Sequence, residues 1–144
     1  MITVKDMLAG KGGHTVHAIE PDARVGDALR YMAEKNVGAL IVIDRGKIVG
    51  IFSERDFARS AVEASGTCTV MPVRDMMTTQ VYYVMPEDTI DQCMALMTNK
   101  RVRHLPVLDN SVPIGMISIG DVVNATISEQ KKTIDQLERY IRGG

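Results

Sequence analysis

Two short motifs in this chain place polar side chains where a phosphate or a ribose could be held. Each motif reads Gly, two apolar residues, Ser, two variable residues and Asp, at residues 50–56 and again at residues 115–121. The apolar pair is typical of the end of a buried strand, and the Ser is typical of the start of a helix. A strand that runs directly into a helix leaves free backbone N–H groups and a partial positive charge at one point, which favours phosphate.

The two motifs belong to an internal repeat with a period of 65 residues. The Gly, Ser and Asp of the first motif each have a counterpart 65 positions later, and so do several apolar residues, such as Leu40 and Leu105. Upstream, residues 4–8 correspond to residues 73–77 at an offset of 69, so the first copy contains four additional residues near 10–13. Similarity at a fixed period indicates two copies of one structural unit.

Hydrophobic patterning predicts the same order of elements in both copies, namely strand, helix, strand, strand and helix, which is a mixed α/β (α+β) fold. In the first copy, after a short helix or turn at 3–8, we expect strands 17–19, 39–43 and 48–52, with helices from 25 to 33 and from 53 to about 65. In the second copy we expect strands 80–84, 103–108 and 114–118, and a helix that Thr89 and Gln92 begin as a capping box. A last helix is expected to begin near Ser118 and to run on, or restart, as far as Arg142.

The connecting segments and the end of the chain complete this outline. Residues 44–47 and 109–111 are expected hairpin turns, residues 66–72 a linker, and residues 10–13 a surface loop that lacks the spacing of a phosphate-binding loop. The run 39–43 is apolar throughout, which indicates a strand buried on both faces. The first helix of the second copy has an apolar stripe of Ile90, Cys93, Met94 and Met97. The last helix has one apolar side that we expect to pack on a second chain or to fold back, formed by Ile127, Ile134, Leu137 and Ile141.

Length and composition exclude several classes of protein. The 144 residues suffice for one compact domain, and 45% hydrophobic with 24% charged residues is typical of a globular chain. A net charge of −1 argues against a nucleic-acid-binding protein. The sequence shows no secretory signal and no apolar run of membrane-spanning length, and the unmatched Cys68 and Cys93 are most simply free thiols. We therefore expect a cytoplasmic protein with no membrane partner.

The order of elements and the two motifs together resemble a pair of CBS domains, also called a Bateman module. The resemblance covers residues 3 to about 125 and includes the Val-x-Asp-Met entry of each copy and the segment 103–107. It implies a stand-alone pair with one copy at 1–66, a second at 73–126 and a helical extension at 127–144. It also implies that the copies pack sheet to sheet with pseudo-two-fold symmetry, that the clefts between them bind AMP, ATP or NAD(H), and that two chains form a homodimer.

The resemblance further assigns roles to residues of this chain. The motif Asp would accept hydrogen bonds from ribose hydroxyls and the motif Ser would contact ribose or phosphate, which here are Asp56 with Ser53 and Asp121 with Ser118. A carboxylate suits this role because charge-assisted hydrogen bonds are the stronger kind. The purine would lie against the first strand and the start of the second strand of a copy. These residues are His17, Ala18, Val37, Gly38 and Ala39 in the first copy, and Thr78, Gln80, Val81, Arg103, His104, Leu105 and Pro106 in the second.

Bound phosphate groups need cations, and arginine suits them because its guanidinium is planar and bidentate. Arg55 and Arg59 lie one helical turn apart, and Arg101 and Arg103 could form the opposite wall. In the second motif Gly120 stands where the first motif has Arg55. The two clefts are therefore expected to differ in affinity or in ligand.

Simpler explanations exist for the same residues. Ser-x-x-Asp before an apolar run is also a helix-capping sequence; two matched copies and the resemblance favour a binding role for the aspartates, while the serines could do both. His104 could be a metal ligand or an acid–base group, but no second ligand stands nearby at metal spacing, so we expect a hydrogen-bonded histidine and no metal. We expect His14 and His17 to be ordinary surface residues.

These observations favour a regulatory, energy-sensing protein that binds an adenine nucleotide and does not convert it. Binding would shift the conformational equilibrium, and a regulated partner would read that shift. The alternative is an interaction or dimerisation module with non-binding clefts that uses its C-terminal helix to dock a partner. A hydrolase is a third possibility, which the lack of a nucleophile with a recognisable base disfavours.

Overall fold

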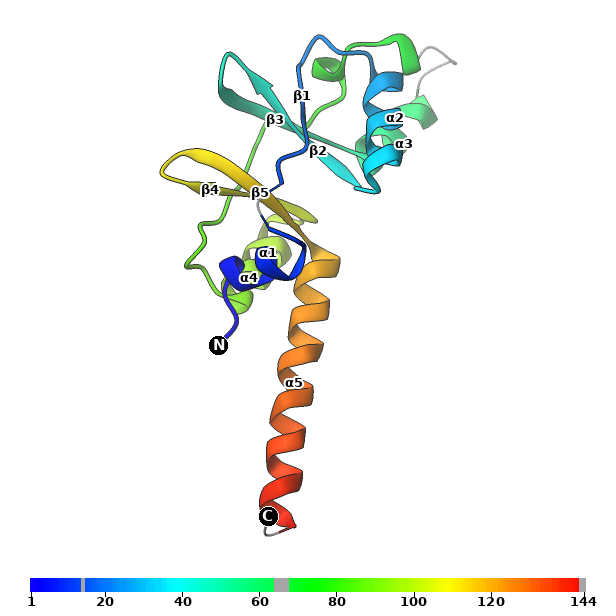
Figure 1. The fold of residues 1–144 in the computed structure, drawn as a ribbon. Coiled ribbons are helices and arrows are strands. Elements are labelled where there is room, and N and C mark those ends of the chain that lie inside the picture. The colour runs from blue at the N-terminus through cyan, green and yellow to red at the C-terminus, as the bar shows by residue number, and fades with distance from the viewer. Residues whose placement is uncertain (14, 64–67, 143–144) are drawn as a thin grey trace. The chain divides into compact units, whose positions relative to one another are not determined.

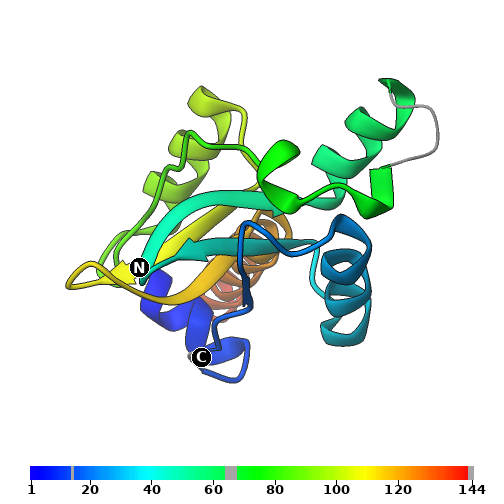
Figure 2. The same ribbon diagram turned by 90° about the horizontal axis from the view of Figure 1, so that it is seen from above.

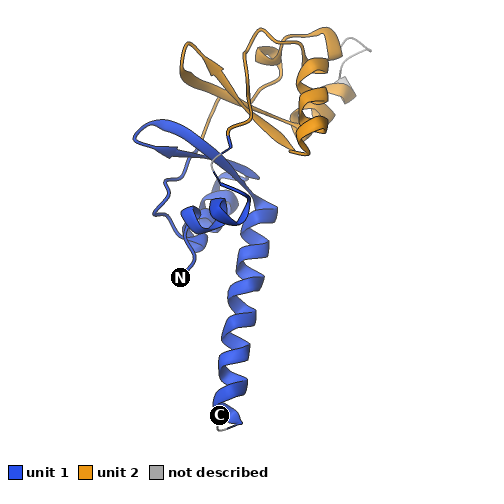
Figure 3. Cartoon of the chain, viewed as in Figure 1, with its two compact units in different colours: residues 1–15, 82–144 blue, residues 16–81 orange. Residues whose placement is uncertain are grey.

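The computed structural model describes residues 1–13, 15–63 and 68–142 and divides the chain into two compact units. Unit 1 contains Met1–Thr15 and Tyr82–Gly144, and unit 2 contains Val16–Val81 (Figure 3). Both units contain helices and strands, and each has a small sheet, as Figures 1 and 2 show from two directions. The expected α+β fold is confirmed.

Unit 2 is built on a three-stranded sheet with the order β1-β2-β3. β1 (Ala18–Ile19) pairs with β2 (Ala39–Asp44) in parallel, and β2 pairs with β3 (Lys47–Ser53) in the antiparallel direction. The hairpin between β2 and β3 turns through Arg45 and Gly46, whose φ angles of 51° and 80° are those of the type I′ turn that matches strand twist. Four consecutive buried residues begin β2, which confirms a strand covered on both faces.

Two helices accompany this sheet, and both views show them at the end of the hairpin where β3 finishes (Figures 1 and 2). α2 (Val25–Lys35) buries Val25, Ala28 and Met32, whose spacing places them on one helical face. It ends at Asn36, which takes the left-handed conformation that commonly terminates a helix. α3 (Glu54–Glu63) follows β3 without an intervening loop.

Unit 1 contains a two-stranded sheet of β4 (His104–Asp109) and β5 (Val112–Ser118), and its described residues also form three helices. The helices are α1 (Val4–Gly10), α4 (Ile90–Lys100) and α5 (Ile119–Ile141). The expected capping box of α4 is confirmed, because the Gln92 N–H donates to Thr89 Oγ1 at 3.2 Å and the Thr89 N–H donates to Gln92 Oε1 at 2.8 Å. The expected apolar stripe of α4 is wrong in one residue: Met94 is 39% exposed, since it lies about 100° around the helix from buried Cys93.

The strand expected at 80–84 does not form as a continuous ladder. Thr78 makes an isolated bridge with Ile51 in unit 2, and Val84 makes one with Val107 in unit 1. The residues between these two bridges therefore lie where the chain passes from one sheet to another, so they have no common partner strand. The expected linker at 66–72 also differs, because Cys68–Val70 forms a 3₁₀ turn and Cys68 is buried in the core; residues 66 and 67 lie outside the described residues.

Each compact unit takes its entry segment from the other sequence repeat. In unit 1 the Val4 N–H donates to Asp88 O at 2.7 Å, and in unit 2 the Val73 N–H donates to Ala23 O at 2.8 Å. The hairpin glycines show the same exchange. A Cβ added at Gly115 would lie 2.8 Å from Leu8 Cδ2, and one added at Gly50 would lie 2.8 Å from Met77 Sδ. The compact units thus divide the chain differently from the sequence copies at 1–66 and 73–126.

The last helix is continuous, as Figure 1 shows, and it extends away from the rest of unit 1. The expected apolar side is present on its exposed part: Ile127 is 46% exposed, Ile134 54%, Leu137 57% and Ile141 81%. Within the described part of the chain, no helix has both the length and the apolar composition of a membrane span.

Cys93 gives a first testable prediction. Its side chain is fully buried, and burial, with a smaller contribution from the Asp88 charge, raises the pKa of its thiol to about 11 from an ordinary 9.0. We expect native Cys93 to resist iodoacetamide at about pH 8, because only the thiolate reacts. Peptide mass spectrometry before and after urea unfolding measures this, and rapid labelling of the native chain would contradict it. Between pH 9.0 and about 11 the unfolded thiol ionises first, so the folded state should lose stability as pH rises.

Candidate functional site

The two motifs form equivalent junctions at which a strand ends and a helix begins. In unit 2 the Glu54 N–H at the start of α3 donates to Gly38 O at 3.1 Å, and in unit 1 the Ile119 N–H at the start of α5 donates to Arg103 O at 2.8 Å. The sheet register places Ala39 opposite Ser53 and His104 opposite Ser118. Residues expected at the start of the second strand therefore lie beside the motif Ser in each unit.

At the unit 2 junction, Ser53 and Asp56 cap the helix reciprocally. The Asp56 N–H donates to Ser53 Oγ at 3.1 Å, and the Ser53 N–H donates to Asp56 Oδ2 at 2.9 Å. The other carboxylate oxygen of Asp56 accepts a hydrogen bond of 3.0 Å from Thr78 Oγ1. This partly exposed carboxylate is therefore held by two separate segments of unit 2.

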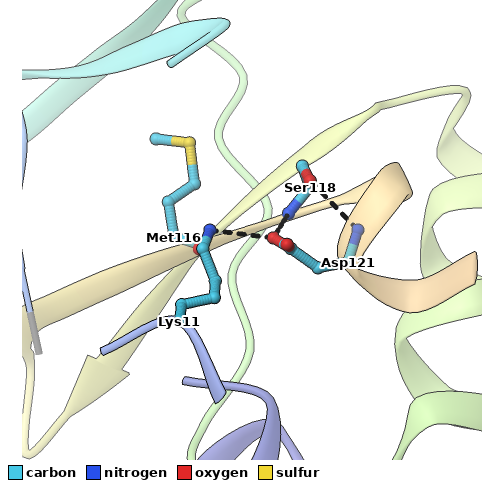
Figure 4. A network of polar contacts seen from close by, with 4 residues as sticks. All are labelled: Lys11, Met116, Ser118 and Asp121. Carbon is cyan, nitrogen blue, oxygen red and sulfur yellow. Dashed lines mark hydrogen bonds and ion pairs between the residues drawn. The ribbon is translucent and has the colours of Figure 1, made fainter. Parts of the chain in front are cut away.

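At the unit 1 junction, Ser118 and Asp121 form the same capping box, and a lysine is added (Figure 4). The Ser118 N–H donates to Asp121 Oδ2 at 2.8 Å, and the Asp121 N–H donates to Ser118 Oγ at 3.2 Å. Lys11 Nζ donates to the same Oδ2 at 2.8 Å and to the carbonyl oxygen of Met116 at 3.0 Å. The Ser118 N–H and Lys11 Nζ therefore meet at the same carboxylate oxygen, Asp121 Oδ2.

The surroundings of Asp121 lower its pKa below the ordinary value of 3.8. Burial acts in the opposite direction, but it is outweighed by the hydrogen bond and charge of Lys11 and by the hydrogen bonds from Ser118. This carboxylate is therefore charged at neutral pH, and a charged carboxylate is suited to accepting hydrogen bonds from hydroxyl groups.

The ion pair between Lys11 and Asp121 gives a second prediction. We expect Lys11→Met to lower the free energy of unfolding by about 0.5–1 kcal/mol at neutral pH, because both side chains are partly exposed and their attraction is screened. A carboxylate with a lowered pKa stabilises the fold above its ordinary pKa, and this contribution disappears as pH falls through the folded value. The difference between wild type and variant should therefore vanish in acid. Urea denaturation at a series of pH values measures it, and a difference that persists after the carboxylate has been protonated in acid would indicate lost packing instead.

Capping is thus established for both Ser-Asp pairs, and the same carboxylates remain partly exposed. Removing the cap hydroxyl with Ser118→Ala should cost about 0.5–2 kcal/mol of stability. Thermal melting measures this third prediction, with Ser128→Ala on the exposed surface of the same helix as the control. Equal melting temperatures for the two variants would mean that the cap contributes nothing.

The structure distributes the other expected site residues between the two units. Thr78 belongs to unit 2, where it donates to Asp56 of the first copy, because the entry segments are exchanged; Gln80 and Val81 also belong to unit 2. In unit 2, His17 and Ala18 lie on or next to β1, and the His17 carbonyl accepts from the Ile41 N–H at 3.1 Å. His17 Nδ1 is 3.5 Å from the Tyr31 hydroxyl, so this partly buried histidine contacts α2, whereas the sequence predicted an ordinary surface residue.

Several expected purine contacts have side chains that belong to the core. Ala39, Leu105 and Pro106 are buried, so these residues can offer a ligand mainly their backbone groups. Val37, Gly38 and His104 are partly exposed. The four arginines and Gly120 are exposed, with Arg55 and Arg59 on α3, Arg101 at the end of α4, Arg103 before β4 and Gly120 in the first turn of α5.

Lys11 is the residue that sequence reasoning missed. It lies in the segment 10–13, which was expected to be an ordinary surface loop. The one available signal was that the first copy has four additional residues there, including a cation between glycines. Spacing along the chain could not reveal that this cation reaches Asp121, which is 110 positions away.

Each unit also has a surface hollow near its junction. In unit 1, Lys11 and Asp121 line a groove of about 730 Å³ along α1 and α5, with Met7, Asn124 and Lys132 among the other lining residues. In unit 2, a hollow of about 480 Å³ between α2 and α3 is lined by Val37, Gly38, Glu54 and Phe57. Both volumes fall within the range of small-molecule sites, which is about 300–1,000 Å³.

Known proteins that resemble this chain contain CBS domains. A family model of the CBS domain matches residues 14–63 and 73–128. The chain is 36% identical over 150 residues to the mitochondrial CBS domain-containing protein CBSX3 of Arabidopsis thaliana, covering 99% of this chain and 73% of that one. Among solved structures, the CBS domain protein NE2398 is 48% identical with a TM-score of 0.81, over 88% of this chain and 98% of that one.

A more distant solved structure contains ligands. It is the CBS domain pair of protein MJ0100 in complex with 5-methylthioadenosine and S-adenosyl-L-methionine, and it is 19% identical with a TM-score of 0.78. It covers 90% of this chain, and this chain covers 98% of it. At that level of identity, the likeness concerns the fold.

Proposed function

The chain belongs to the CBS domain family, with two such domains, and from this premise we propose that it is a regulatory module that binds an adenine nucleotide without converting it. The observation that carries the proposal is the pair of equivalent junctions. At each one, a partly exposed aspartate is fixed at a helix start and is also contacted by a second segment, Thr78 for Asp56 and Lys11 for Asp121. The adenosine compounds bound by the MJ0100 pair support the adenosine part of the ligand.

In this proposal the junctions recognise ribose and phosphate. The aspartate accepts hydrogen bonds from the ribose hydroxyls, and the partial positive charge at the start of α3 or α5 favours a phosphate nearby. AMP, ATP and NAD(H) share these groups, and all three are candidates. Binding favours the conformation with the higher affinity, and a regulated partner responds to that conformation. We also propose a cytoplasmic location; a tagged chain that enters an organelle, as the name of the Arabidopsis relative states for that protein, would contradict it.

Calorimetry tests the proposal directly. The full chain is titrated with AMP, ATP, NAD and NADH, and with 5-methylthioadenosine and S-adenosylmethionine. We expect at least one dissociation constant below about 1 mM, which is about 4 kcal/mol of binding free energy. Melting with that ligand at about 100 times its dissociation constant should add about 2.7 kcal/mol of stability. No heat and no shift with any of these ligands would reject the proposal.

The exposed side of α5 favours a second candidate function, which is self-association or partner docking. Ile127, Ile134, Leu137 and Ile141 follow spacings of seven, three and four, which is the pattern of a helix that pairs with another helix. We propose a homodimer in which this side is covered. Sedimentation of wild type against Leu137→Glu tests it: the wild type should be a dimer and the variant a monomer. A monomeric wild type, or a variant that remains dimeric, would exclude α5 as the interface.

A further inference from the structure

We propose that Lys11 makes the Asp121 site selective for nucleotides that carry a phosphate over the corresponding nucleosides. The inference rests on the proposed function, and it concerns a residue to which neither the motifs nor the family resemblance gave a role. Its basis is the ion pair of 2.8 Å between Lys11 Nζ and Asp121 Oδ2, formed at the edge of a groove large enough for a nucleotide.

The chain places Lys11 at this carboxylate by specific local structure. α1 is anchored in the unit 1 core by Val4 and Leu8, which are 0% and 2% exposed. The helix ends at Gly10; the N–H of the capping residue Lys11 donates to Leu8 O at 3.0 Å, and the chain then turns through Gly12 and Gly13 at φ angles of 93° and 105°. Residues other than glycine rarely adopt these angles, so the loop that carries Lys11 depends on its sequence.

The two junctions differ at this point in charge. Asp56 accepts from the neutral hydroxyl of Thr78 on Oδ1, whereas Asp121 accepts from an ammonium group on Oδ2. Met77 and Leu8 contact equivalent glycines, so Thr78 and the residues that follow Leu8 occupy equivalent places in the two units. The four additional residues of the first copy supply the lysine at the place where the other copy has a threonine.

The charge difference has a consequence for binding. Ribose hydroxyls that bind Asp121 compete with Lys11 for the carboxylate, so a ligand must weaken or share the ion pair. A nucleoside offers the ammonium group nothing in return. A nucleotide offers a phosphate, which the long and flexible lysine side chain, 41% exposed, can reach and neutralise. The affinity of this site should therefore depend strongly on the phosphate.

The test compares AMP with adenosine in a chain whose other junction is disabled by Asp56→Asn. Calorimetry gives the ratio of the two affinities with Lys11 present, with Lys11→Met, and with Lys5→Met as a control that removes an exposed lysine of the adjoining helix α1. We expect AMP to bind at least about tenfold more tightly than adenosine, and the ratio to fall to within about threefold in Lys11→Met only. In that variant, the affinity for adenosine should be unchanged or higher.

Each other outcome overturns one identified claim. If AMP binds but the ratio survives Lys11→Met, or if both ligands weaken equally, Lys11 does not select for phosphate while the proposed function stands. If neither ligand binds even to the unmodified chain, while other adenine nucleotides also fail, the proposed function falls, and this inference falls with it. Lys11→Met in an Asp121→Asn background should leave the ratio unchanged, and a change there would place the effect at the Asp56 junction.

Discussion

Leu8→Ala should lower the free energy of unfolding by about 2–5 kcal/mol, because it leaves a cavity where a fully packed side chain stood. Leu8 is 2% exposed and lies against Gly115 of the hairpin that the other sequence copy contributes. Gly115→Ala should also destabilise, by about 1–3 kcal/mol, since the new Cβ would lie 2.8 Å from Leu8 Cδ2. The double variant should lose less than the sum of the two, because the smaller side chain at position 8 makes room for the methyl group.

Urea denaturation of the four chains measures this coupling, which should be about 0.5–3 kcal/mol. Gly10→Ala is the control, since a Cβ there would meet no atom within 4 Å. Additive effects would mean that Leu8 and Gly115 are not in contact. The same cycle in unit 2, with Met77→Ala and Gly50→Ala, should show weaker compensation, because the Cβ at Gly50 would also lie 2.8 Å from the backbone oxygen of Thr78.

Asp121→Asn and Asp56→Asn should each reduce the affinity of one site for its nucleotide by about 10- to 100-fold, which is about 1–3 kcal/mol. The amide is nearly the same size as the carboxylate and its oxygen can still accept from the Ser N–H, so the helix cap is largely kept. What is lost is the charge that strengthens hydrogen bonds from ribose hydroxyls. Melting of the ligand-free variants should therefore change much less than binding does.

Calorimetric stoichiometry and affinity separate the two sites in this experiment. Asp88→Asn is the matched control in unit 1, because Asp88 Oδ2 likewise accepts from a backbone N–H, that of Met85, at 2.8 Å, but it lies outside the junction. Unchanged affinity in both junction variants would show that the nucleotide binds elsewhere. A loss in one variant alone would assign binding to a single unit.

The sequence by itself determined the local structure of this protein. Repeat period, apolar spacing and turn residues predicted both hairpins, the order of the main elements, the capping box at Thr89 and the two strand–helix junctions. Each of these features depends on residues close together in the chain. Local geometry fixes which backbone groups need partners and which neighbours can supply them. The capping geometry of Ser53 with Asp56, and of Ser118 with Asp121, was among the alternatives for the same reason.

Only the tertiary structure decided which segments meet. The entry segments 4–8 and 73–77 are so similar that either could fit either hairpin glycine by sequence, and folding placed each one in the unit of the other copy. That exchange brought Thr78 to Asp56 and divided the segment 78–84 between two sheets. It also brought Lys11 to Asp121, a contact between charges 110 residues apart. Contacts over such a distance in sequence depend on how the core packs. A periodic pattern of apolar residues does not show which segments will pack against each other.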